Sequence, residues 1–221
     1  MRRRAVKDEQ KQERRQVLLD VAWELFQAAS YQSLTINEVA ERARLAKGTV
    51  YLYFKTKEEL FLSLQEQQLA AWFAEVNMRL QAMPAAPEDD PVIQVVEILC
   101  ETLKQRPGLT RLLAIMHTVL EQNIDFETAL HFKQMLLGHV SGTGALLEQR
   151  LPFLTTGQGA RIILHINALA IGLQHMADPA PVVQRVLDEH ELKIFAIDFA
   201  REFSATLQTL LYGVQYLSSR S

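Results

Sequence analysis

Five residues between positions 47 and 53 are suited to contacting a polyanion. In the stretch AKGTVYLYFKTKEEL, residues 46–60, they are a cation, a bare backbone, a hydroxyl and two phenols: Lys47, Gly48, Thr49, Tyr51 and Tyr53. Cations and hydroxyls donate hydrogen bonds to phosphate oxygens and to base edges. Gly48 weakens a helix by ~1 kcal/mol relative to alanine, but it lets a phosphate or base approach the backbone closely. The alternative is that the tyrosines stabilise the packing of a small helical domain.

A helix from about residue 46 to residue 54 would divide this stretch into two faces. Apolar residues four positions apart predict an inward face of Ala46, Val50 and Phe54. We expect the other face to be exposed, with Tyr51 on the border: Lys47, Gly48, Thr49, Leu52, Tyr53 and Lys55. A surface with a cation, hydroxyls, a bare backbone and an apolar contact suits a DNA major groove.

Two further helices are expected to hold this one in place. The first runs from about residue 13 to residue 28, with an inward face of Val17, Val21, Leu25 and Phe26. Thr35 and Glu38 form a capping box, which predicts a second, short helix ending near Arg42. Two short helices joined by a tight turn and braced by a third are the layout of a helix-turn-helix.

Helical spacing continues along almost the whole chain, so we predict an all-α fold. Thr56 and Glu59 form another capping box, opening a long helix to about residue 80 with Phe61, Leu64, Leu69, Phe73, Val76 and Leu80 apolar. The proline-rich acidic stretch MPAAPEDDP, residues 83–91, is the clearest break, and Asp90-Pro91 would cap the next helix. Further helices are predicted at about 92–105, 108–122, 126–150, 157–176, 181–190 and 192–217.

The charge distribution differs between the two parts of the chain. Residues 1–60 hold 12 Lys+Arg against 9 Asp+Glu, whereas the remaining 161 hold 11 against 17. This asymmetry predicts that only the N-terminal part meets a polyanion. The basic arm of Arg2, Arg3, Arg4, Lys7 and Lys11 either follows the DNA backbone or is a solvated tail.

The location expected from the sequence is the cytoplasm, without membrane contact. The single cysteine, Cys100, allows no internal disulfide framework. No apolar run approaches the ~20 residues that span a bilayer, and the N-terminus MRRRAVKDEQKQERR has no apolar segment behind it.

Catalysis is not expected, and no catalytic residue, metal site or cofactor is predicted. The six histidines are scattered, with no His-Glu-x-x-His and no Cys/His cluster. The stretch GHVSGTGA, residues 138–145, lacks a preceding strand and is better explained as a close helix crossing. A small-molecule enzyme remains one alternative, and a helical adaptor that binds proteins without DNA is another.

Residues 14–62 resemble the DNA-binding domain of the TetR family of bacterial transcriptional regulators. The matching pieces are LLDVAWELF, LTINEVAERA and AKGTVYLYFKTKEEL. The resemblance implies a recognition helix at 46–53, with Lys47, Gly48, Thr49 and Leu52 at or near bases. It implies phosphate contacts from Thr35, Tyr51, Tyr53 and Lys57.

Two positions depart from the family pattern. Family members usually have glycine in the turn where this chain has Arg44, and often a serine cap where it has Ala46. An arginine at positive φ would cost on the order of 1 kcal/mol, and a lost cap costs a similar amount. Arg44 could recover part of this cost by reaching a phosphate.

The resemblance also implies the domain organisation and the mechanism. A DNA-binding domain, residues 1–55, would precede a ligand-binding and dimerisation domain, residues 56–221. A largely hydrophobic effector is predicted to contact Trp72, Phe73, Met116, His117, Phe132, Met135 and His139. The alternative for each of these residues is a place in the hydrophobic core. Helices 157–176 and 192–217 would pair two subunits, and the alternative is that they pack within one chain. Their small residues, which permit close approach, are Gly159, Ala160, Ala168, Ala170, Gly172, Ala196, Ala200 and Ala205. The expected protein is a homodimeric repressor that binds a palindromic operator and is released by the effector.

Overall fold

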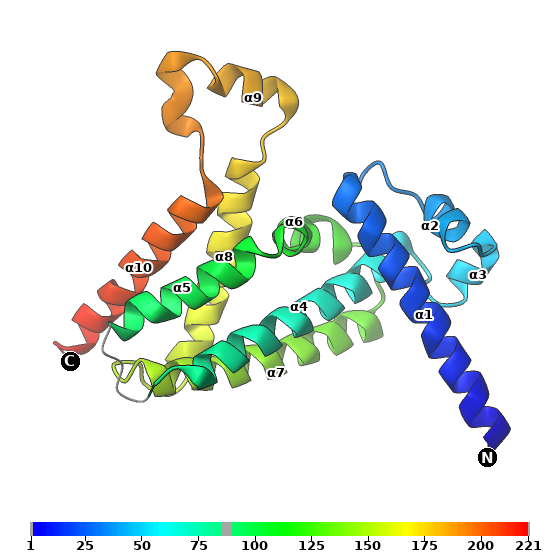
Figure 1. The fold of residues 1–221 in the computed structure, drawn as a ribbon, viewed down its shortest axis with the longest axis horizontal. Helices are drawn as coiled ribbons and strands as arrows, with labels where there is room; N and C mark the ends of the chain where they lie inside the picture. The colour runs from blue at the N-terminus through cyan, green and yellow to red at the C-terminus, as the bar shows by residue number, and fades with distance from the viewer. Residues whose placement is uncertain (1, 85–89, 221) are drawn as a thin grey trace. The chain divides into compact units, whose positions relative to one another are not determined.

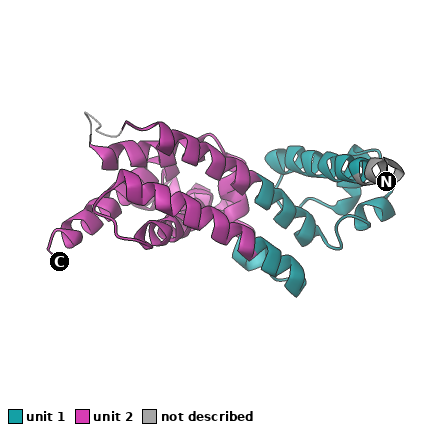
Figure 2. Cartoon of the chain, turned by 90° about the horizontal axis from the view of Figure 1, so that it is seen from below, with its two compact units in different colours: residues 1–67, 116–132 teal, residues 68–115, 133–221 magenta. Residues whose placement is uncertain are grey.

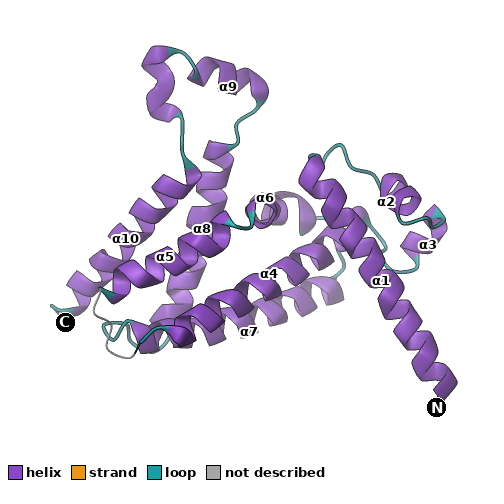
Figure 3. Ribbon diagram, in the orientation of Figure 1, coloured by secondary structure: helices purple, strands orange, loops and turns teal. Residues whose placement is uncertain are grey.

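The computed structural model describes residues 2–84 and 90–220, which are helical with no strand (Figures 1 and 3). The prediction of an all-α fold is therefore confirmed. The helices are α1 Arg2–Ala28, α2 Ile36–Arg42, α3 Lys47–Tyr51, α4 Lys57–Ala82, α5 Pro91–Lys104, α6 Pro107–Ile115, a π-helix Met116–Leu120, α7 Phe126–Arg150, α8 Gln158–Ala177, α9 Pro181–Leu187, a 3₁₀ helix His190–Phe195 and α10 Phe199–Ser218. Most of the stretch 83–91 lies outside the described residues.

The chain forms two compact units, shown in teal and magenta in Figure 2. The first unit comprises residues 1–67 and 116–132, and the second comprises residues 68–115 and 133–221. Helices α4 and α7 each contribute one part to both units. These units do not follow the expected division into 1–55 and 56–221, which concerns function and stays a prediction.

Among the four residues predicted to face inward on α1, Phe26 is buried as expected and the other three are not. Leu18, Leu19, Ala22 and Phe26 are buried, whereas Val17 is 45% exposed. The prediction placed Val17, Val21 and Leu25 inward because they share a spacing of four, but Leu18 and Ala22 have the same spacing to Phe26. Aromatic contacts complete this core: the ring of Phe61 lies 5.6 Å from Phe26 and 5.0 Å from Tyr31, both edge-on.

Helix capping explains where several elements begin. Thr35 accepts from the Glu38 backbone N–H, and Glu38 accepts from the Thr35 N–H, so the capping box of α2 is confirmed. Asp90 accepts from the Val92 N–H with Pro91 in the first turn, as predicted. Thr56 accepts from the Glu59 N–H, but the Glu59 carboxylate binds the backbone N–H of Lys55, one residue earlier than in a capping box.

Two helices of the second half of the chain differ from their predicted bounds. The predicted helix 108–122 changes to π geometry at Met116, where the N–H of Glu121 bonds to the carbonyl of Met116. The predicted helix 192–217 is a 3₁₀ helix followed by a break, and α10 begins only at Phe199, capped by the Asp198 side chain. Apolar spacing continues across both irregularities, so periodicity alone could not locate them.

The second unit contains a close crossing of α7 and α8. A Cβ at Gly144 would lie 2.4 Å from the backbone nitrogen of Ala160, and a Cβ at Gly159 would lie 2.0 Å from the carbonyl oxygen of Gly144. The backbones therefore touch, as predicted for the GHVSGTGA stretch. Only one of its glycines is needed for this contact, because Gly138 and Gly142 face open space.

We predict opposite effects for two glycine-to-alanine changes on α7. Gly144→Ala should lower the free energy of unfolding by about 1–3 kcal/mol, because the added methyl group meets a backbone that cannot move aside. Gly142→Ala should raise it by up to ~1 kcal/mol, because alanine favours the helix and the site is open. Urea denaturation followed by circular dichroism measures both. Equal effects would contradict the crossing.

Candidate nucleic-acid interface

Helix α3 is oriented by two buried side chains. Val50 is fully buried and Phe54, just past its end, is 1% exposed. The Arg15 guanidinium of α1 lies over the Phe54 ring, 5.1 Å from its centre. On the other side, Lys47 and Gly48 are exposed. The predicted division of the two faces therefore holds for these residues.

Ala46 does not lie on the inward face, so this part of the prediction is wrong. It is exposed, and its extended backbone (φ −70°, ψ 144°) makes it the residue preceding the helix. Helical periodicity cannot be applied to a residue outside the helix. The helix is also shorter than the predicted 46–54, because it ends at Tyr51.

The remaining residues of this stretch differ in exposure. Leu52 is 77% exposed and Tyr51 44% exposed. Thr49 and Tyr53 are half-buried. A wide, mixed surface thus continues from Lys47 past the end of α3, with an apolar side chain at Leu52 and a phenol at Tyr51.

The turn before α3 has the strained residue that the sequence predicts. Arg44 has φ 56°, and it is the one non-glycine residue at positive φ among those described. Backbone bonds hold it there: the N–H of Arg44 donates to Glu41 and that of Leu45 to Ala40, at 3.0 and 2.9 Å. The Arg44 side chain is exposed. Ala46 offers no side-chain cap to α3, also as expected.

Lys57 points into its own unit. Its ammonium donates to the carbonyl of Tyr31 and lies over the Tyr31 ring, 3.8 Å from the centre. Burial lowers the pKa of Lys57. The Thr35 hydroxyl is bonded to Glu38 at 2.8 Å. The phosphate contacts expected of both side chains stay predictions, and Lys57 would have to leave Tyr31 to make one.

A contact that the sequence did not reveal lies beside α3, within the first unit. The Lys55 ammonium pairs with the Asp125 carboxylate at 2.5 Å, and the Thr56 hydroxyl donates to the Asn123 carbonyl at 3.3 Å. The hydrogen bond from Lys55 holds the pKa of Asp125 well below its usual range. The partners are about 70 residues apart in the chain, and no local pattern predicts such a pair.

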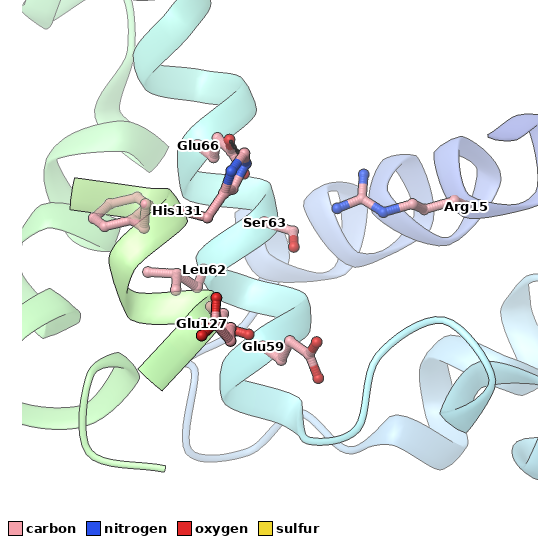
Figure 4. A pocket seen from close by; sticks show the side chains of 9 residues that line it. Arg15, Glu59, Leu62, Ser63, Glu66, Glu127 and His131 are labelled. Carbon is pink, nitrogen blue, oxygen red and sulfur yellow. Dashed lines mark hydrogen bonds and ion pairs between the residues drawn. The ribbon is translucent and has the colours of Figure 1, made fainter. Parts of the chain in front are cut away.

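A cavity of about 320 Å³ lies between α1, α4 and α7 of the first unit (Figure 4). Its lining is Arg15, Glu59, Leu62, Ser63, Glu66, Glu127, Thr128, His131 and Phe132. The Nε2 atom of His131 lies 3.1 Å from a carboxylate oxygen of Glu66, within hydrogen-bonding distance. Three carboxylates make this lining too polar for the largely hydrophobic effector expected from the sequence, and Phe132 is its one member from the predicted effector set.

The predicted effector-binding residues fall into both compact units. In the second unit, Phe73 lies 4.8 Å from Trp72 and stacks in parallel on His139 at 5.0 Å. The Trp72 indole donates to Thr102, so it is already hydrogen-bonded, and Met135 is half-buried. The other members belong to the first unit: Met116, His117 and Phe132.

In the first unit, Met116 and Phe132 are buried while His117 is exposed. Gln65, which sequence reasoning missed, is fully buried and its amide donates to the sulfur of Met116. Its carbonyl oxygen has no hydrogen-bond partner. A buried glutamine on an otherwise apolar helix face is the signal that could have been noticed in the sequence.

Helices α8 and α10 each have a buried and an exposed face. Their buried faces, which include Ile166 and Leu207, pack within the second unit. The exposed positions recur at a spacing of three or four: Leu164, Ala168, Gly172 and Met176 on α8, and Ala205, Thr209, Gly213 and Tyr216 on α10. Of the small residues predicted to pair subunits, Gly159 and Ala170 are instead buried inside the chain.

This chain belongs to the TetR family of bacterial regulators. Residues 18–64 match the family model "Bacterial regulatory proteins, tetR family", and residues 66–216 match "Tetracyclin repressor-like, C-terminal domain". The second match alone covers more than half of the 221 residues. The expected family and the N-terminal helix-turn-helix are thus confirmed.

Curated relatives match over less than half of the chain. The fatty acid metabolism regulator protein of Bacillus subtilis (strain 168) is 28% identical over 79 residues, 36% of this chain and 41% of that protein. The HTH-type transcriptional regulator AcrR of Shigella flexneri is 33% identical over 93 residues, 42% of this chain and 41% of the relative. The chain thus spans about two fifths of the length of these relatives.

Solved structures share the fold over most of the chain. The fatty acid degradation regulator FadR from Bacillus halodurans has a TM-score of 0.54 at 17% identity, covering 89% of this chain and 93% of that one. FadR from Bacillus subtilis in complex with stearoyl-CoA has a TM-score of 0.52 at 18% identity, covering 89% and 96%. At these identities the comparison establishes the fold.

The described residues offer no membrane span and no metal site. No described helix is long and apolar enough to cross a bilayer. No three His, Cys, Asp or Glu side chains in the described part of the chain are placed to hold a metal ion. Burial raises the pKa of the Cys100 thiol, which disfavours the nucleophilic thiolate.

Ala46→Ser should stabilise the protein by about 0.5–1 kcal/mol. Serine at this extended position would accept a hydrogen bond from a free N–H at the start of α3, which now has no side-chain cap. Ala46→Val, which cannot accept such a bond, is the control and should bring no gain. Urea denaturation distinguishes the two, and an equal effect of both would contradict the proposed capping.

The free energy of unfolding should fall above about pH 10, because the Tyr31 phenol then ionises in the unfolded chain but not in the folded one. Burial, together with its hydrogen bond to Glu58 at 2.9 Å, raises the pKa of this phenol in the folded state. The unfolded phenol ionises near pH 10, so its contribution is complete below that pH and is lost as the pH rises.

In Tyr31→Phe the ring under Lys57 remains, so the difference from the original protein isolates the hydroxyl. We expect the free energy of unfolding of this variant to be ~1 kcal/mol lower than that of the original protein at pH 8. Between pH 10 and 11.5 its free energy of unfolding should decrease less steeply with pH. Urea denaturation at each pH measures both. Parallel curves for the two proteins would show that Tyr31 is not the titrating group.

Proposed function

We propose that this protein is a cytoplasmic, DNA-binding transcriptional regulator that acts as a homodimer, most simply a repressor at a palindromic operator. The observation that carries the proposal is the exposed face of α3. Lys47, Gly48 and Leu52 are exposed while Val50 is buried. An enzyme would not need this surface, and a helical adaptor would present a more apolar one.

Each exposed group has a distinct role in the proposed complex. The Lys47 ammonium donates to a base edge or to a nearby phosphate, and Leu52 makes an apolar contact such as that with a thymine methyl group. Gly48 has no neighbouring atom within 4 Å of the place where a Cβ would lie, so the α3 backbone can approach the DNA. Arg44, which is exposed in the preceding turn, contributes a phosphate contact in this proposal.

The dimer forms through the exposed stripes of α8 and α10. Small residues in these stripes permit close approach of two helices, and Gly172 and Gly213 have open space around them. A two-fold axis makes such an interface self-complementary and sets two α3 helices about 34–36 Å apart, one turn of DNA. The predicted pairing through 157–176 and 192–217 is thus retained, without the part of the second segment before α10.

An effector would act through α4, which begins beside α3 and belongs to both compact units. We propose a largely hydrophobic molecule near Trp72, Phe73 and His139. It need only prefer the state that does not bind DNA, because a coupling of ~1–3 kcal/mol changes DNA affinity by roughly 5- to 150-fold.

Lys47→Ala should weaken binding to the operator by roughly 5- to 100-fold, because it removes a contact worth ~1–3 kcal/mol. Selection of bound fragments from genomic DNA first identifies the operator, and fluorescence anisotropy at fixed salt then gives the affinity. Dimerisation, followed by sedimentation, should not change.

The control is Lys104→Ala, which removes another exposed lysine, at the end of α5. It should leave the affinity unaltered. Equal effects of the two variants would refute the assignment of the α3 face. If no DNA fragment is selected in a salt-dependent manner, the adaptor becomes the better explanation.

A further inference from the structure

The segment between α8 and α10, residues 178–198, has no core of its own. We call it the arm. It contains α9 and the 3₁₀ helix, and none of its described side chains is buried. Figure 1 shows the arm extending beyond the ends of α8 and α10, with α9 and the 3₁₀ helix side by side.

Exposed large apolar side chains are more frequent per residue in the arm than in the rest of the described chain. Val182, Val183 and Val186 of α9 are 59%, 43% and 49% exposed, and Ile194 and Phe195 of the 3₁₀ helix are 82% and 61% exposed. The described part of the chain has 17 such residues, and five of them lie in the arm. The arm makes up less than a tenth of the described residues.

An ordered segment of this kind needs a partner. A helix as short as the seven residues of α9 is unstable by itself and depends on packing. Adjacent exposed apolar residues mark an interaction surface. The geometry of the arm therefore implies that another surface covers Ile194 and Phe195.

Charge and connectivity identify the covering surface. The arm holds five acidic residues, Asp178, Asp188, Glu189, Glu191 and Asp198, against Arg185 and Lys193. This excess of negative charge disfavours DNA and an anionic membrane. The arm begins two residues after Met176, the last exposed apolar position of the α8 stripe, and continues into α10. It is thus continuous with the proposed dimer interface.

We propose that the arm packs on the second subunit of the dimer, with Ile194 and Phe195 buried against the partner. The inference rests on the proposed dimer and extends it. Two-fold symmetry makes the contact reciprocal, so that each subunit clasps the other with one arm. The arm thereby adds apolar contact area to the interface of α8 and α10.

The first test replaces the two apolar anchors. Ile194→Ser/Phe195→Ser should raise the dimer dissociation constant about 10- to 100-fold, measured by sedimentation equilibrium, because two apolar side chains per subunit lose their buried environment. Helix content should remain, since neither residue belongs to the core. The matched control is Met78→Ser/Leu137→Ser, two side chains that are 61% and 65% exposed outside the arm, α8 and α10.

The control should leave the dissociation constant unaltered. A wild-type chain that stays monomeric at all concentrations refutes the dimer itself. A wild-type dimer whose dissociation constant is the same in the Ile194→Ser/Phe195→Ser variant refutes the arm contact alone.

The second test locates the contact. A photoreactive phenylalanine analogue at position 195, in a dimer of mixed light and heavy-isotope chains, should crosslink light chains to heavy ones. Mass spectrometry identifies the attachment site. Crosslinks confined to one chain would show that the arm folds back on its own subunit, and the proposal would be wrong.

Discussion

The burial of Val50 and Phe54 is the constraint on which the proposed function depends. Helix α3 has five residues, too few to be stable without packing. Its position is therefore set by the burial of these two side chains in the first unit, whose core also contains the edge-on pair of Phe26 and Phe61. With Val50 directed inward, Gly48 falls on the opposite side of the helix, and Lys47, the first residue of α3, is exposed. A surface chemistry suited to DNA is thus a consequence of core packing.

The first unit includes a segment from the middle of the chain. Residues 116–132 join the N-terminal helices, and Asp125 and Asn123 bind Lys55 and Thr56, which lie between α3 and α4. In the same unit the π-helix begins at Met116, against the buried Gln65, whose carbonyl oxygen is unpaired. An unpaired buried polar atom costs ~1–3 kcal/mol. The region where the middle and N-terminal segments meet therefore contains a polar group whose burial is not compensated by a hydrogen bond.

Much of the fold follows from local patterns. The capping box of Thr35 and Glu38, the Asp90-Pro91 helix start and the long apolar face of α4 were predicted and occur. Strain at Arg44 was predicted from its place in the turn and is present. Each of these features depends on residues that are close in the sequence, so a local sequence pattern is sufficient to predict it.

Other features required contacts between distant segments. Periodicity could not choose between Val17 and Leu18 as the buried side of α1, because each has apolar partners at helical spacing. Periodicity could not show that the Lys57 side chain turns toward Tyr31. Nor could it show that Gly159 contacts the α7 backbone while Gly172 has open space around it. Pairs such as Lys55 and Asp125 lie too far apart in the sequence for any local pattern.

The sequence by itself determined the helical class, the helix-turn-helix and its family, because caps, turn residues and apolar spacing act over a few residues. Only the tertiary structure decided which apolar residues are core and which remain exposed, since burial depends on what each helix packs against. For this reason the apolar residues of the arm look like core in the sequence and are exposed in the folded chain.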